Sequence, residues 1–142
     1  MHAAAVITPA TLRAYKETDY RVLDSESFVL RIGDASTALL AAHQRHQVAF
    51  SAFLTACNPF SQPTAAEVNA TRQAELVAQL ERLGLVYMEG MGQHPSNGWP
   101  GESSVLVFGL DLQPAKVLAA HFQQNAFVWS GADAVPRLIL LK

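Results

Sequence analysis

The sequence contains little cysteine, little charge and no long apolar run. Cys57 is the only cysteine among 142 residues, so an intramolecular disulfide and a zinc site made of cysteines are both excluded. Apolar runs such as LILL at 138–141 are far shorter than the roughly 20 residues that a membrane-spanning helix needs. We therefore expect no membrane partner.

Charge of either sign is scarce. The chain has 10 basic and 12 acidic side chains, a formal net charge of -2, and no run rich in lysine or arginine. Nucleic acid binding depends on clustered positive charge, so nucleic acid is not an expected partner. Apolar residues make up 50% of the sequence, which excludes a disordered or fibrous protein.

Signals for export, metal binding and catalysis are missing as well. The N-terminal segment MHAAAVITPATLRAY lacks the charged region and the apolar stretch of a signal peptide, so we expect a soluble cytoplasmic protein. His43 and His46 are three residues apart on a predicted helix, but no acidic residue at suitable spacing completes a metal site, and none is predicted. No motif indicates a cofactor or a reaction class, so both stay unknown.

The chain length and the order of the predicted elements indicate one α/β (α+β) domain over residues 1–142. Helices are expected at 9–16, with Thr8 as N-cap and Pro9 as first helical residue, at 36–47, at 65–83, with Gly84 as its C-terminal cap, and at 114–124. The nearly continuous apolar run at 48–57 favours a strand that is buried on both faces. Strands are expected on both sides of the turn 24–27 and at 48–57, 85–90, 103–110, 125–131 and 136–141, the last as an edge strand because Pro136 begins it. This order predicts a mixed β-sheet flanked by about four helices, in which the β-α-β steps favour some parallel pairs.

The helix at 65–83 carries two polar residues where its apolar side should continue. Thr64 and Glu67 have the spacing of a capping box, so the helix should begin just after Thr64. Leucines form the C-terminal half of its apolar side, whereas Asn69 and Arg72 occupy the N-terminal half. We therefore expect Asn69 and Arg72 to face the sheet, near the end of the preceding strand.

This strand-to-helix corner is a candidate ligand site. Free backbone N–H groups and the positive end of the helix dipole converge at such a corner, and Arg72 adds a planar fork of donors that suits a carboxylate or phosphate. Asn58, Ser61 and Thr64 lie on the approach. The expected ligand is a small anionic metabolite or nucleotide. The structural alternatives are that Arg72 pairs with Glu102 and that Asn58 only ends its strand.

The glycine-rich segment 90–102 contains His94, Trp99 and Glu102 and resembles neither a dinucleotide-binding nor a P-loop fingerprint. As a long loop it could fold over the corner, with His94 or Glu102 as a general acid or base and Trp99 as a stacking surface. Asn125 could reach the same pocket. The alternative is a plain hairpin connection with Trp99 anchored on the core.

Several phrases in order, AYKETDYRV, FVLRIG, FLTACNPFS, GWPGESSVLVFGL and FQQNAFVW, resemble the bacterial domain-of-unknown-function family 3293. The resemblance extends from about residue 14 to residue 141. It implies a small bacterial protein and carries over no catalytic residue. Its phrases include several of the residues selected above on physical grounds.

Three functions remain open. The first is a binding or regulatory domain for a small ligand at the 58–72 corner. The second is an enzyme on the same site, with Glu102 or His94 as acid or base. The third is a protein-interaction module that forms a homodimer through the edge strand 136–141, with the polar cluster as internal scaffolding.

Overall fold

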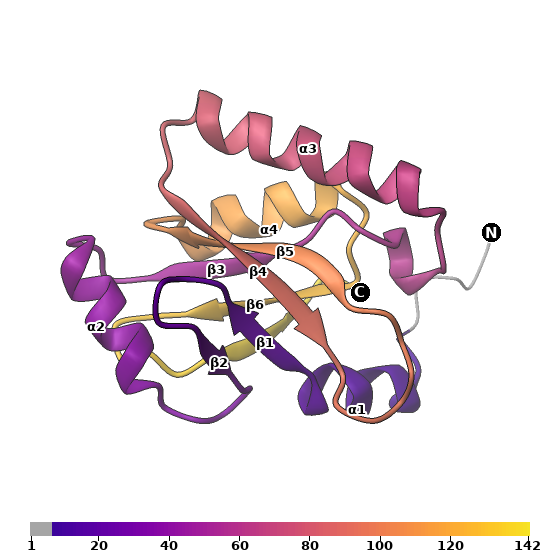
Figure 1. Ribbon diagram of the computed structural model, residues 1–142, viewed down its shortest axis with the longest axis horizontal. Coiled ribbons are helices and arrows are strands. Elements are labelled where there is room, and N and C mark those ends of the chain that lie inside the picture. Colours follow the sequence, from indigo (N-terminus) through magenta and orange to yellow (C-terminus); the bar gives the residue numbers. More distant parts are fainter. Residues whose placement is uncertain (1–6) are drawn as a thin grey trace.

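The computed structural model describes residues 7–142, in which four helices accompany one seven-stranded sheet (Figure 1). In chain order the elements are α1 (Pro9–Glu17), β1 (Asp19–Val22), β2 (Phe28–Leu30), α2 (Thr37–Arg45), β3 (Ser51–Leu54), the short 3-10 helix η2 (Pro59–Ser61), α3 (Ala66–Arg82), β4 (Tyr87–Gln93), β5 (Glu102–Phe108), α4 (Leu112–His121), β6 (Ala126–Ser130) and β7 (Arg137–Leu140). The predicted α+β class is confirmed. No helix within residues 7–142 has the length and apolar character needed to cross a membrane.

The expected parallel strand pairs were wrong. The strands lie in the order β2-β1-β4-β5-β3-β6-β7, and each neighbouring pair among the described residues is antiparallel. The crossovers through α2, α3 and α4 do join strands that point the same way. However, the two strands that each crossover joins are not neighbours in the sheet, because other strands lie between them. For example, β5 lies between β3 and β4. The sequence pattern indicated the crossovers but contained no signal for these insertions.

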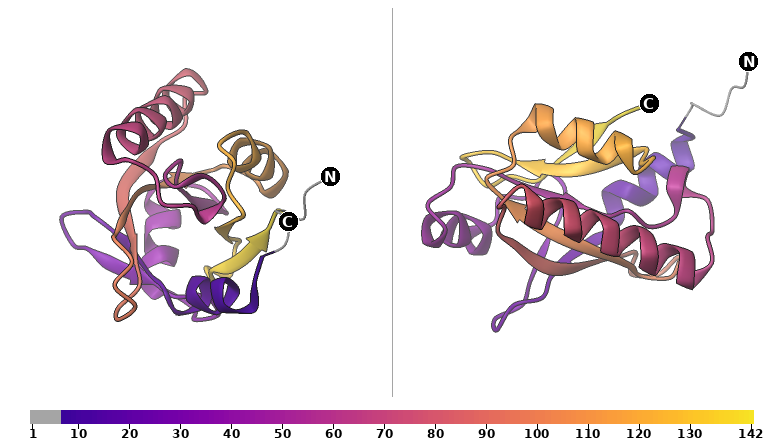
Figure 2. Two further views of the ribbon diagram at one scale, coloured as in Figure 1. Left: turned by 90° about the vertical axis from the view of Figure 1, so that its right-hand side faces the viewer. Right: turned by 90° about the horizontal axis from the view of Figure 1, so that it is seen from above.

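Helices cover both faces of the sheet. Ala52 and Leu54 of β3 face α3 and α4, with Leu76 and Leu80 of α3 buried against that side. Phe53, between them, points to the opposite face, where α2 packs. This alternation follows from the period of two residues in a strand, and it explains why β3 is buried throughout. Figure 2 shows α3 and α4 together on one side of the molecule.

The sheet is curled, and its two edges approach each other on the side of α2 (Figure 2). The segment after edge strand β2 hydrogen-bonds to the segment before edge strand β7. Gly33 N–H donates to the Pro136 carbonyl over 2.9 Å, and Ser36 N–H donates to the Ala134 carbonyl over 3.0 Å. The face of the sheet that contains Phe53 and is covered by α2 is called the inner face below. It is closed at the α2 end, and α1 lies over its other end.

The helix starts agree with the sequence in part. The Thr8 hydroxyl accepts from Thr11 N–H over 3.1 Å, with Pro9 as the first helical residue, as predicted for α1. The capping box predicted for α3 was wrong. Its N-cap is Ala65, whose side chain makes no capping bond. The backbone N–H of Thr64 instead donates to the Asn58 side chain, which holds the chain extended before the helix begins.

Gly90 allows β1 and β4 to pack closely. A Cβ atom on Gly90 would lie 2.8 Å from the Arg21 carbonyl oxygen and 2.8 Å from the Phe53 ring. A Cβ on Gly92, two residues along the same strand and face, would meet nothing closer than 3.8 Å. The two glycines are therefore not equivalent: only Gly90 is required by packing.

We predict that Gly90→Ala destabilises the protein by about 1–3 kcal/mol, because the added methyl group overpacks the contact with backbone and a buried ring. Gly92→Ala is the matched control and should change stability little. Urea unfolding of the three proteins measures the difference. Equal stabilities for the two variants would contradict this account of Gly90.

His43 is a buried neutral histidine of α2. It is 2% exposed, its Nε2 lies 2.8 Å from the Ser51 hydroxyl, and its Nδ1 has no partner among the described residues. Burial lowers the pKa of His43 below its ordinary value of 6.5. The unfolded chain therefore takes up a proton more readily than the folded protein does.

We predict that the part of the unfolding free energy due to His43 is lost as the pH falls from 6.5 toward the lower pKa that His43 has in the folded protein. His43→Gln should flatten the pH dependence of stability in that interval. His121→Gln, at an exposed position on α4, should leave it unchanged. Urea unfolding at a series of pH values decides the matter, and an unchanged slope in His43→Gln would refute it.

Candidate functional site

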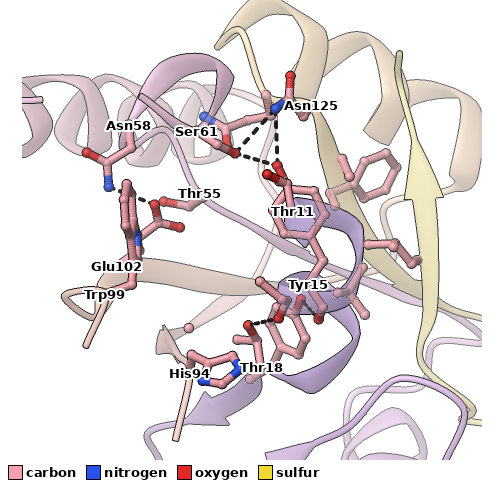
Figure 3. Close-up of a pocket in the computed structure, with 18 of the residues that line it drawn as sticks. Thr11, Tyr15, Thr18, Thr55, Asn58, Ser61, His94, Trp99, Glu102 and Asn125 are labelled. Atoms are coloured by element: carbon pink, nitrogen blue, oxygen red, sulfur yellow. Dashed lines mark hydrogen bonds between the residues drawn. The ribbon is translucent and has the colours of Figure 1, made fainter. Parts of the chain in front are cut away.

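A cavity of about 330 Å³ lies between α1, the inner face of the sheet and the loop 94–101. Figure 3 shows side chains from these three parts pointing into it. Its lining combines aromatic rings, hydroxyls and amides with one carboxyl group. The polar lining includes Tyr15, Thr55, Asn58, Ser61, Glu102 and Asn125. The size and the mixed lining are those of a small-molecule site.

Glu102, the first residue of β5, supplies the carboxyl group. Its Oε2 accepts a hydrogen bond from Asn58 Nδ2 over 2.7 Å, and Trp99 lies beside it (Figure 3). Burial raises the pKa of the Glu102 carboxyl above its ordinary value, and the hydrogen bonds from Asn58 and Trp99 oppose that shift only in part. Gly92 is directly opposite Glu102 on β4, so no side chain from that position fills the space beside the carboxyl.

A cluster of hydroxyl and amide groups forms another part of the wall. The Tyr15 hydroxyl of α1 makes a short hydrogen bond with the Ser61 hydroxyl. Asn125 Nδ2 donates to both oxygens, over 3.1 Å to Tyr15 and 3.3 Å to Ser61 (Figure 3). Tyr15, Ser61 and Asn125 come from α1, η2 and the start of β6, so the cluster holds α1 against the sheet.

His94 fastens the loop 94–101 to α1. Its Nε2 lies 3.1 Å from a Glu17 carboxylate oxygen, and its Nδ1 accepts from the backbone N–H groups of Ser96 and Asn97, each over 3.1 Å. Because Nδ1 accepts, the proton of a neutral ring must be on Nε2. Both ring nitrogens are thus engaged in holding the loop.

The backbone beside the cavity is strained. Asn58, Phe60 and Ser61 all have positive φ angles, of 49°, 54° and 58°. Asparagine tolerates the left-handed region, but for phenylalanine and serine it costs on the order of 1 kcal/mol each. Phe60 N–H donates to the Gln123 carbonyl over 2.7 Å, which helps to fix this turn. Such strain is concentrated at functional sites in many proteins.

The predicted site residues divide into three groups. Six of them line the cavity: Asn58, Ser61, His94, Trp99, Glu102 and Asn125. Thr64 and Asn69 line a neighbouring groove of about 840 Å³ between α3 and the β4–β5 hairpin, where Asn58, Trp99 and Glu102 also contribute. Arg72 lines neither. The loop is a lining element, as expected, but it is shorter than predicted because β4 extends to Gln93.

Arg72 and Asn69 do face the end of β3, as predicted, but the protein itself occupies their polar groups. Arg72 Nε donates to the Ala56 carbonyl over 2.7 Å, and its Nη2 donates to the Phe122 carbonyl and to Gln123 Oε1. Asn69 exchanges hydrogen bonds with Asn58. The alternative of an Arg72–Glu102 ion pair is not borne out, because Glu102 forms no ion pair among the described residues.

Sequence reasoning missed the contribution of α1 and β1. Thr11, Tyr15 and Thr18 of the first helical segment line the cavity, as does Tyr20 of β1. The Tyr20 hydroxyl donates to the Tyr15 carbonyl over 2.6 Å. Two tyrosines in the phrase AYKETDY were an available signal, but nothing in the local pattern indicated which elements α1 would cover.

Residues 54–127 match a family described as "Protein of unknown function (DUF3293)". The chain belongs to this family. The matched segment begins at the last residue of β3 and ends in β6, so it contains Asn58, Glu102 and Asn125 but not Tyr15 of α1. No curated protein and no solved structure matches the chain.

We predict that Glu102→Gln makes the folded protein more stable than the wild type at pH 8. The pKa of Glu102 is higher in the folded protein than in the unfolded chain, so its ionisation opposes folding, increasingly as the pH rises through the folded pKa. An uncharged side chain of the same shape removes this cost. The gain should disappear at pH 4, below the ordinary value of 4.5, where both states are protonated.

The measurement is the melting temperature of the wild type, of Glu102→Gln and of the control Glu89→Gln at pH 8 and pH 4. Glu89 is exposed on β4, so the control should show no pH-dependent gain. A stability difference for Glu102→Gln that is the same at both pH values would mean that the carboxyl is not desolvated in the folded protein.

Proposed function

We propose that this protein binds a small organic molecule in the cavity between α1, the inner face of the sheet and the loop 94–101. The observation that carries the proposal is the half-buried carboxyl of Glu102 at a cavity wall, hydrogen-bonded by Asn58 and facing the space left open by Gly92. A desolvated ionisable group in a concave, mostly apolar site is a recognised mark of ligand binding.

The energetic cost of the site supports a role beyond stability. The wall contains a half-buried carboxyl and the left-handed residue Ser61, and the left-handed Phe60 lies directly before Ser61; each of the three lowers the stability of the fold. An apolar replacement at Glu102 would remove one of these costs. Their coincidence at the same cavity is what a binding site requires and a purely structural core does not.

An enzyme on the same site is the second candidate, since the pKa of Glu102 is shifted in the direction that suits a general acid. Binding ranks first because the other proposed acid or base, His94, uses both ring nitrogens to hold the loop. The cytoplasmic location and a homodimer through the strand 136–141 stay predictions.

Gly92 offers a way to test the proposal without removing any polar group. A leucine at this position would project into the cavity, and its Cβ would make ordinary contacts of 3.8 Å or more. We predict that compounds which raise the melting temperature of the wild type in a screen of small polar and aromatic molecules will have no effect on Gly92→Leu. The variant itself should stay folded.

Gln93→Leu is the matched control, because Gln93 is exposed and points to the other face of the same strand. It should respond to the same compounds as the wild type. Compounds that stabilise Gly92→Leu as strongly as the wild type bind outside the cavity and would defeat the proposal.

A further inference from the structure

The charged side chains of the cavity wall indicate the sign of the charge that a ligand should carry. Among residues 7–142, no lysine or arginine lines the cavity, although Glu102 does. The arginine–carboxylate pairs in the described chain involve Asp19 twice, Asp24 and Asp133, and Glu17 contacts the His94 ring; none of these contacts includes Glu102. Its hydrogen-bonding partners are neutral: the amide of Asn58, at 2.7 Å, and the side chain of Trp99.

A carboxylate held in this way is incompletely neutralised. Removing it from water costs free energy that the hydrogen bonds from two neutral groups, Asn58 and Trp99, do not return in full. The expectation of an anionic ligand depended on Arg72, whose guanidinium is bound to the Ala56 and Phe122 carbonyls and does not reach the cavity. A second negative charge beside Glu102 would be repelled by it.

The aromatic part of the wall favours the same sign of ligand charge. Tyr15, Tyr20, Phe53 and Trp99 line the cavity, and the rings of Tyr20 and Phe53 meet edge to face with centroids 5.4 Å apart. The faces of such rings attract cations, most strongly where water is excluded, and they also cover the apolar part of a ligand. Figure 3 shows Trp99 and Glu102 next to each other at one side of the cavity.

We infer that the cavity takes a small organic cation, a protonated amine on an apolar body of about the size of one ring. The ammonium group would pair with the Glu102 carboxylate, in the space opposite Gly92, and the apolar body would lie against the aromatic rings. The inference rests on the proposed function and specifies the ligand class of the same site.

Three probes of nearly the same shape test the inference: benzylamine, benzyl alcohol and benzoate, which carry a positive, no and a negative charge at pH 7. Binding is followed by titration of ¹⁵N-labelled protein in two-dimensional NMR, which also reports whether each variant is folded. Benzylamine should bind the wild type roughly tenfold more tightly than benzyl alcohol, as a close charge pair provides, and benzoate should bind most weakly.

Glu102→Gln should abolish the preference for benzylamine while leaving the affinity for benzyl alcohol nearly unchanged. Glu89→Gln, the exposed control on β4, should keep the preference of the wild type. Benzyl alcohol or benzoate binding as tightly as benzylamine, or a preference that survives in Glu102→Gln, overturns the inference. Failure of all three probes to bind also overturns it, whereas the broader proposal is judged separately by the compound screen with Gly92→Leu.

Discussion

The hydrogen bonds of Asn58 hold together the part of the molecule that surrounds the cavity. Its backbone N–H donates to Asn69 on α3, its side-chain oxygen accepts from Thr64 and Asn69, and its side-chain nitrogen donates to Glu102 on β5. One residue thus joins the end of β3 to a helix, to the turn before that helix and to a neighbouring strand. Its left-handed backbone, with φ of 49°, is what directs these groups outward in three directions.

Arg72 completes this arrangement from the same side of α3, about one turn further along the helix than Asn69. Its guanidinium binds carbonyl groups at the ends of β3 and α4, so the first half of the helix is tied to both elements by charge-assisted hydrogen bonds, in addition to the apolar packing of Leu76 and Leu80. The polar residues on the apolar side of α3 therefore connect three segments: α3, the end of β3 and the end of α4. These hydrogen bonds fix the turn 58–61, which places Asn58 and Ser61 at the wall of the cavity.

Local signals in the sequence were sufficient for the order of the elements and for much of the site. Pro9 after Thr8 marked α1, Gly84 marked the end of α3, and the continuous apolar run marked β3, because each depends on residues close in the chain. The antiparallel order of the strands and the place of Tyr15 could not be predicted, since both follow from contacts between distant segments. Arg72 was correctly predicted to face the sheet. Its backbone carbonyl partners could not be predicted, because every residue has a carbonyl group and the sequence does not distinguish those of Ala56 and Phe122.

The two hydrogen bonds that join the edges of the curled sheet have a consequence for self-association. A free edge strand offers unpaired backbone groups to another chain, which is the common route to sheet extension and aggregation. Here the carbonyls of Ala134 and Pro136 are already taken by Ser36 and Gly33, and proline has no N–H to offer. These two carbonyls are therefore not free for another chain, which leaves Arg137–Leu140 as the strand at this edge of the sheet.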